Sequence, residues 1–147
     1  MKRSRAERAL VLHAVALHTA IAAFCRLLRF GSLSRVLERF YPPPAGPCIS
    51  LDTELEAHVT WAVATAAQTF PAGSTCLTRA LTAQCLLRRH GGDATLRFGV
   101  RGGEPVAAHA WLESSGRELA GLSTGAGYRA LGPSTALRPA PSVVEGR

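Results

Sequence analysis

The sequence is short of the residues that mark several common classes of protein. Lys2 is its only lysine, and its arginines are dispersed rather than gathered into a basic run with interleaved aromatic side chains. Aromatic residues make up only 6% of the chain, and no cysteines and histidines have the spacing of zinc ligands. Nucleic-acid-binding domains and zinc modules depend on these patterns. The sequence therefore argues against a nucleic-acid partner and against a bound metal.

Cysteine is present but forms no recognisable framework. The chain has four, Cys25, Cys48, Cys76 and Cys85, with no CxxC pair among them. In a chain of this size the pattern indicates free thiols in a reducing compartment, which predicts a cytoplasmic protein. Cys76 and Cys85 fall on one expected helix and are too far apart along it to form a disulfide.

The overall composition is that of one folded domain. The 147 residues are 47% hydrophobic and 18% charged, which gives enough apolar material for one core and too little charge for a disordered chain. The formal net charge is +7, and such an excess favours an acidic partner. An acidic segment of a substrate peptide would meet this expectation.

The amino-terminal part is expected to be helical. Residues 9–24 are almost wholly apolar and follow a basic start, a pattern shared by signal peptides, short membrane helices and buried helices. The helical pattern continues through residues 25–30 with no small-residue cleavage site, and His13 and His18 interrupt the apolar run. These features favour a helix over residues 5–29 that docks on the core of a soluble protein, and they disfavour contact with a membrane.

Glycine and proline divide the rest of this part. Gly31-Ser32 is expected to end the first helix, and residues 33–40 then form a short amphipathic helix. Residues 41–47 are rich in proline and are expected to form a stiff connector. The expected divisions of the whole chain are a helical amino-terminal segment with its connector over residues 1–47, a core over residues 48–132 and a flexible tail over residues 133–147.

One cysteine stands where a helix is expected to begin. Proline and glycine in residues 71–73 end the helix expected over residues 52–70. The hydroxyl of Ser74 or Thr75 then offers a cap to the next helix. Cys76 would lie in the first turn of that helix, where free backbone N–H groups and the helix dipole stabilise a thiolate. This position makes Cys76 a candidate nucleophile.

A histidine lies in the middle of the strands expected downstream. Residues 94–101, 106–113 and 117–121 are separated by turns and form three expected strands, and residues 128–131 offer a fourth. A helix packed on this sheet would bring its first turn against the middle of a strand and place its cysteine beside His109. A cysteine and a histidine are the minimum for thiol catalysis, because the imidazole takes the thiol proton and later protonates the leaving group.

Four segments carry these residues in order. They are Cys76-Leu77-x-Arg79-Ala80-Leu81, Leu86-Leu87-Arg88-Arg89-His90-Gly91, Ala94-x-Leu96-Arg97-x-Gly99-Val100-Arg101 and Ala108-His109-Ala110-Trp111-Leu112-Glu113. Together they closely resemble the leader peptidases of lasso-peptide biosynthesis, which belong to the transglutaminase-like cysteine peptidases. The resemblance implies an α+β fold, in which amino-terminal helices precede a transglutaminase- or papain-like core. In that core, catalytic Cys76 lies on a helix and catalytic His109 lies on a small antiparallel sheet.

The resemblance also implies a third catalytic residue, usually an aspartate on the next strand that orients the imidazole. Its expected position falls at or near Gly121, where the sequence has no acid. Glu113, on the same strand face as His109, and Glu118, on the next strand, are the nearest candidates, and the sequence does not choose between them. Glu113 could instead be a structural part of the motif. A Cys–His dyad held by a backbone carbonyl or by water is a further alternative, because loss of the orienting residue lowers the rate without abolishing the chemistry.

The resemblance implies removal of the leader from a ribosomally made precursor peptide. It also implies action beside a separate leader-recognition protein and an ATP-dependent lasso cyclase, and it calls for no cofactor. Thr75, Arg79 and Trp111 are the expected substrate contacts, although Arg79 could instead hold its helix to the sheet through an ion pair. Two other functions are left open by the sequence. One is acyl transfer on the same Cys–His chemistry, and the other is non-catalytic peptide binding by a degenerate site.

Overall fold

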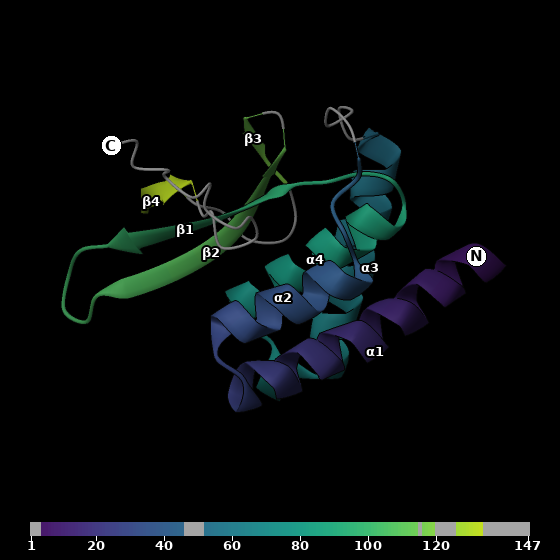
Figure 1. Cartoon of the computed structure of the whole chain (residues 1–147), viewed down its shortest axis with the longest axis horizontal. Helices are drawn as coiled ribbons and strands as arrows, with labels where there is room; N and C mark the ends of the chain where they lie inside the picture. The colour runs from purple at the N-terminus through teal and green to yellow at the C-terminus, as the bar shows by residue number, and fades with distance from the viewer. Residues whose placement is uncertain (1–3, 46–51, 115, 120–125, 134–147) are drawn as a thin grey trace, which may run out of the picture.

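Helices come first in the chain and an antiparallel sheet follows. The computed structural model describes residues 4–45, 52–114, 116–119 and 126–133. The helices are α1 (Arg5–Leu27), α2 (Phe30–Phe40), α3 (Thr53–Thr69), the short 3-10 helix η1 (Pro71–Gly73) and α4 (Cys76–Arg89), and the strands are β1 (Thr95–Arg101), β2 (Ala107–Ser114), β3 (Arg117–Glu118) and β4 (Arg129–Pro133). The expected α+β class is confirmed (Figure 1).

The break between the first two helices lies earlier than the sequence predicted. Leu28 and Arg29 have extended backbones and separate α1 from α2. Gly31 and Ser32, expected to form the break, instead lie in the first turn of α2. Amides in the first turn of a helix have no partner within the helix in any case, so glycine and serine cost little there. The expected boundary was therefore wrong by about one turn.

The sheet has the order β3-β2-β1-β4, with every neighbouring pair antiparallel. In the central β1–β2 pair, Gly99 lies opposite His109 and Leu96 lies opposite Leu112. β3 is short and pairs with only the last two residues of β2, beyond which the Leu119 amide donates to the Leu112 carbonyl at 3.0 Å. The fourth strand, expected at residues 128–131, is present as β4.

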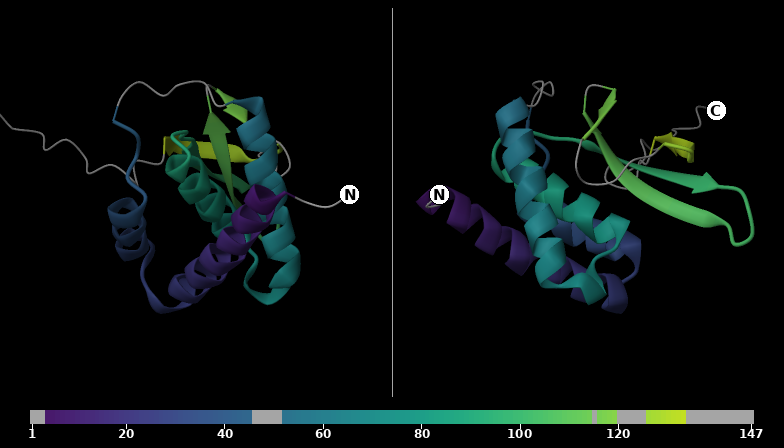
Figure 2. Two further views of the ribbon diagram at one scale, coloured as in Figure 1. Left: turned by 90° about the vertical axis from the view of Figure 1, so that its right-hand side faces the viewer. Right: turned by 180° about the vertical axis from the view of Figure 1, so that it is seen from behind.

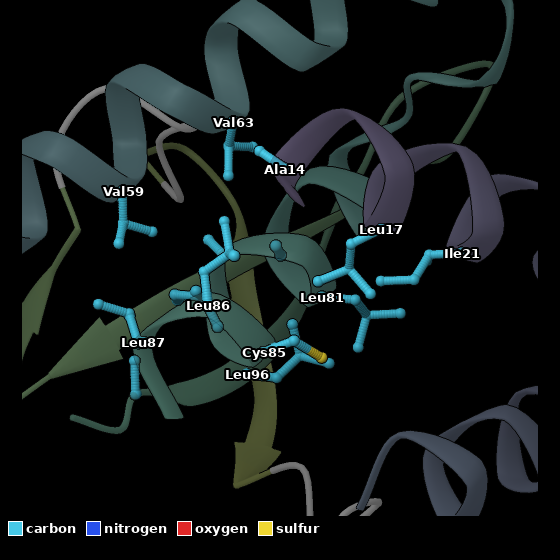
Figure 3. Close-up of a cluster of buried hydrophobic side chains, with 14 of the residues drawn as sticks. Ala14, Leu17, Ile21, Val59, Val63, Leu81, Cys85, Leu86, Leu87 and Leu96 are labelled. Atoms are coloured by element: carbon cyan, nitrogen blue, oxygen red, sulfur yellow. The ribbon is translucent and has the colours of Figure 1, made fainter. Parts of the chain in front are cut away.

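One face of the sheet is covered by the helices (Figure 2). Leu96 of β1 and Ala110 and Leu112 of β2 belong to the same buried cluster as residues of α1, α3 and α4. Figure 3 shows Leu96 near Cys85 of α4, in the lower part of this cluster. The hairpin end of β1 and β2 extends beyond the helices (Figure 1). The side chains of β1 and β2 that alternate with these buried residues lie on the other face of the sheet, away from the helices.

The first helix is part of this core. Ala14, Leu17 and Ile21 of α1 pack into the cluster, and Leu33 and Leu37 bring in α2. By length and composition α1 could also cross a membrane, a test that buried helices of soluble proteins and amino-terminal signal sequences pass as well. Its inward stripe of buried side chains supports the expectation that it docks on the core. The boundary between residues 47 and 48 stays a prediction, since helices on both sides of it share one cluster.

Candidate active site

Cys76 is the first residue of α4, as the sequence predicted. Thr75 is the N-cap: its hydroxyl oxygen accepts from the Thr78 amide at 3.2 Å, and the Thr78 hydroxyl accepts from the Thr75 amide at 2.8 Å. This reciprocal pair fixes the start of the helix at one residue. The Cys76 side chain is half-buried and packs against the edge of the core.

The cap leaves two backbone donors without partners. Thr75 satisfies the amides of Thr78, through its hydroxyl, and of Arg79, through its carbonyl. The amides of Cys76 and Leu77 make no hydrogen bond to any residue that the structure describes. Free amides at the positive end of a helix are a site for negative charge. These amides would stabilise a Cys76 thiolate, or an oxyanion formed when Cys76 attacks a carbonyl, by donating hydrogen bonds to it.

His109 lies near the hairpin end of β2, close to the aromatic rings of Trp111 and Tyr128. Its ring centroid is 6.1 Å from that of Trp111 and 4.8 Å from that of Tyr128, with interplanar angles of 19° and 30°. Its Nε2 atom is enclosed and has no hydrogen-bond partner within the described part of the chain. An imidazole nitrogen in this condition is unusual, because most buried polar atoms have a hydrogen-bond partner.

The two catalytic candidates are on elements that touch, but their side chains are not bonded to each other. α4 packs on β2, and Ala110 and Leu112 join the buried cluster on that side. Since side chains alternate along a strand, His109 and Trp111 belong to the opposite face. Trp111 fits this assignment, being 3% exposed without belonging to that cluster. No hydrogen bond joins Cys76 to His109 in the described residues, so their adjacency stays a prediction.

Neither glutamate is placed to hold the imidazole. Glu113 accepts from the Trp111 indole at 3.0 Å and from Arg97 at 2.8 Å. Burial raises the pKa of the Glu113 carboxyl, but the hydrogen bonds from Trp111 and Arg97 and the charge of Arg97 outweigh it, so the pKa is lowered. Glu118 lies opposite Glu113 across the β2–β3 pair. Four residues of extended strand, about 13 Å, separate His109 from Glu113.

The structure thus favours the structural role for Glu113. Its carboxylate accepts from the Trp111 indole and from Arg97, and so holds the Trp111 ring and joins β1 to β2. This is the structural alternative that the sequence allowed for Glu113. The expected orienting function of either glutamate is not supported by these contacts. Gly121, where the resemblance would have an aspartate, lies outside the described residues.

The three expected substrate contacts differ in how open they are. The Thr75 hydroxyl is engaged in the cap, and the Trp111 ring is buried and held by Glu113. Arg79 makes no ion pair with any described residue, so the alternative of an ion pair to the sheet is not what the structure has. Its Nε is enclosed and unpartnered among the same residues. Arg79 is therefore the best placed of the three to receive a ligand group, and substrate contact by any of them stays a prediction.

Sequence reasoning missed several residues around His109 that come from β1 and from the segment just before β4. Tyr128 stacks on the imidazole, and Arg101 lies over the Tyr128 ring with its guanidinium carbon 5.0 Å from the centroid. Arg97 binds Glu113 across the β1–β2 pair. The alternation of Arg97, Gly99 and Arg101 along one strand was the available signal, because it places the two arginines on one face. Their partners depend on register, which alternation does not give.

Comparison with known families identifies the fold. A family model described as the transglutaminase-like superfamily matches residues 9–132. The chain belongs to the transglutaminase-like superfamily. No curated protein and no solved structure matches it. Members of this superfamily are generally cysteine peptidases or acyltransferases. Membership thus confirms the broader part of the resemblance and supports thiol chemistry at a helix-borne cysteine.

Proposed function

We propose that this transglutaminase-like protein is a cysteine peptidase that removes the leader from a lasso-peptide precursor. The observation that carries the proposal is Cys76 at the first position of α4, beside two amides that have no partner in the described residues. The four sequence segments that resemble the leader peptidases add the substrate class. The reaction would take place in the cytoplasm, with a separate leader-recognition protein and an ATP-dependent cyclase as partners.

The proposed reaction begins with the Cys76 thiolate. The sulfur attacks the carbonyl carbon at the leader–core junction and forms a tetrahedral oxyanion, which the Cys76 and Leu77 amides are available to stabilise. Collapse of this intermediate breaks the C–N bond, and His109 protonates the leaving amine of the core peptide. A thioester between the leader and Cys76 is left on the enzyme. Water, deprotonated by His109, then hydrolyses the thioester and releases the leader as a carboxylic acid.

The proposal requires the His109 imidazole to reach the Cys76 sulfur in the working enzyme. Its Nε2 has no hydrogen-bond partner among the described residues. The requirement is tested by replacing each residue separately. In a true dyad either replacement removes nearly all of the rate, because the two groups act as one unit.

The deciding experiment follows precursor cleavage by mass spectrometry, with the leader-recognition protein present. Wild type should release leader and core. Cys76→Ala and His109→Ala should each release at least about a thousandfold less. Cys85→Ala is the matched control, since Cys85 lies on the same helix but is buried in the hydrophobic core. If Cys76→Ala cut the precursor at the wild-type rate, the proposed mechanism would be wrong.

A second candidate function is favoured by two observations. Neither Glu113 nor Glu118 is placed to orient His109, and alternation puts His109 on the face away from Ala110 and Leu112. A non-catalytic peptide-binding module would have this arrangement. In that case wild type and Cys76→Ala would bind the precursor equally, and neither would cut it.

A further inference from the structure

No described residue makes a hydrogen bond to the His109 imidazole, and two aromatic rings lie close to it, Trp111 on its own strand and Tyr128 just before β4. Its enclosed Nε2 lacks a partner among the described residues, and the nearest glutamate on its face is engaged by Arg97 and Trp111. An imidazole that transfers protons must nevertheless hold one orientation, because misplacement by about 1 Å costs about a hundredfold in rate. Within the described part of the chain, the contacts that can hold this orientation are those of the two rings.

Gly99 makes room for a contact across the sheet. It lies opposite His109 on one side and opposite Ala130 of β4 on the other. With no side chain on Gly99, the Trp111 ring of β2 lies directly against β1. A Cβ on Gly99 would lie 2.8 Å from the Trp111 ring and 3.0 Å from the Arg129 carbonyl oxygen. Glycine inside a strand often marks such a close approach.

Tyr128 reaches His109 from the segment just before β4. Its ring centroid lies 4.8 Å from that of His109, closer than the 6.1 Å of Trp111, at an interplanar angle of 30°. Arg101 places its guanidinium carbon 5.0 Å from the Tyr128 centroid. Such a cation–π contact restrains the tyrosine ring. His109 is thus packed by a ring from its own strand and by a ring that precedes β4, on the far side of β1.

We propose that Tyr128, stacked on His109 across β1 and in cation–π contact with Arg101, is the positioning residue that sets the orientation of the imidazole in this chain. It takes the part that the resemblance gives to a carboxylate. The proposal rests on the proposed peptidase function. The contact itself is independent of that function, and so is part of the test.

The choice of Tyr128 over Trp111 follows from their surroundings. Trp111 is two residues from His109 on β2, and its own ring is fixed by Glu113 and by the approach to Gly99. It provides a wall against which the imidazole lies. Tyr128 directly precedes β4, so its contact with His109 depends on the pairing of β4 with β1. The orientation of the imidazole would therefore depend on the hydrogen-bonded pairing of β4 with β1.

The test compares Tyr128→Leu with the conservative Tyr128→Phe in the full chain. Leucine removes the ring, whereas phenylalanine keeps it, so the second variant should rescue what the first loses. The first readout is the NMR spectrum of isotope-labelled histidine, assigned with His109→Gln. Tyr128→Leu should shift the His109 ring signals through loss of the aromatic ring current, and Tyr128→Phe should retain most of the wild-type shift.

Two kinetic readouts accompany the spectrum. In precursor cleavage, Tyr128→Leu should lower kcat about three- to tenfold with KM nearly unchanged, a range set by the worth of an aromatic pair. Alkylation of Cys76 by iodoacetamide reports the help of the imidazole without any precursor, and it should slow by a similar factor. Phe98→Leu is the control. It removes the edge contact with Phe30, at a centroid distance of 5.5 Å, and should lower stability without moving the His109 signals.

The outcomes separate this proposal from the proposed function. Unshifted His109 signals in Tyr128→Leu, or a wild-type alkylation rate and kcat, would overturn the positioning role. Failure of the wild type to cut any precursor would count against the peptidase, and the alkylation rates of the two Tyr128 variants would then decide the positioning role alone. Equal losses in Tyr128→Leu and Phe98→Leu would reduce the effect to general destabilisation and would also overturn it.

Discussion

At the scale of single residues, the cysteines differ in how deeply their thiol groups are buried. Cys85 is 2% exposed in the middle of α4, and its burial raises its pKa to about 12, against a smaller lowering by Arg88. Burial also raises the pKa of Cys25. Cys76, at the start of the same helix as Cys85, is half-buried and lies beside amides that have no partner in the described part of the chain. Position along one helix therefore distinguishes a packing cysteine from a candidate nucleophile.

We predict that iodoacetamide at pH 8 modifies Cys76 well before Cys25 and leaves Cys85 unmodified in the folded protein. The thiolate is the reactive form, and a pKa of about 12 leaves almost none of it at Cys85. Peptide mapping by mass spectrometry after timed labelling measures each site. Unfolding in urea should abolish the difference between Cys76 and Cys85. Labelling of Cys85 as fast as Cys76 in the folded state would contradict the assignment.

Single-residue signals in the sequence succeeded where the chemistry is local. Thr75 and Cys76 could be placed because an N-cap and a first turn depend on neighbours within four residues. Trp111 was expected to meet substrate, yet it is buried by contacts with Glu113 and Gly99. Those contacts depend on the alignment of β1 with β2. The stacking of Tyr128 on His109 requires a third strand as well, and no spacing within the sequence reports it.

At the scale of elements, two helices in this chain begin with the same device. Ser4 and Glu7 form a reciprocal cap on α1, as Thr75 and Thr78 do on α4. Only the second lies at the proposed site. The two caps therefore allow the loss of helix stability to be separated from the loss of function.

We predict that Thr75→Ala and Ser4→Ala each lower the free energy of unfolding by about 1 kcal/mol, the usual loss for an N-cap. Thr75→Ala should also reduce precursor cleavage and slow the alkylation of Cys76, because the first turn of α4 is then less well fixed. Ser4→Ala should leave both rates near those of wild type. Urea unfolding and the two rate assays measure these effects. Equal rates in the two variants would show that the α4 cap has no part in the chemistry.

The elements themselves were predictable for the same reason as the caps. The ranges expected for α1, α3, α4, β1 and β2 agree with the structure to within one or two residues, because each has its own apolar period and its own end signals. The break at Leu28 and Arg29 was missed because neither residue is a helix breaker. Packing of α2 against the core, through Leu33 and Leu37, sets that break instead.

At the scale of the whole molecule, His13 and His18 connect α1 to the rest of the chain. The His18 ring is fully buried and its Nδ1 lies 3.3 Å from the Thr82 hydroxyl of α4. The Thr82 hydroxyl donates to the Thr78 carbonyl at 2.7 Å, so His18 donates to Thr82. His13 meets the Tyr41 hydroxyl at 3.0 Å. These contacts join elements that are far apart in sequence.

Both histidines make the fold sensitive to acid. Burial, and then the charge of Arg79, lowers the pKa of His18 below 6.5. Burial, and then the charges of Arg89 and His90, does the same for His13. In the unfolded chain both rings take up protons as the pH falls through about 6.5. The folded protein takes them up only at lower pH, so the stability present above pH 6.5 is lost progressively on acidification.

We therefore predict that the free energy of unfolding, measured with urea, falls between pH 7.5 and pH 5.5. The double variant His13→Gln/His18→Gln should be less stable at pH 7.5, because it loses two native contacts, and should show a shallower fall over this interval. Glutamine cannot take up a proton, so the two positions no longer bind more protons in the unfolded state than in the folded state. An unchanged slope in the double variant would mean that other groups set the acid sensitivity. A shallower slope would show that protonation at these two contacts works against the docking of α1 on the core.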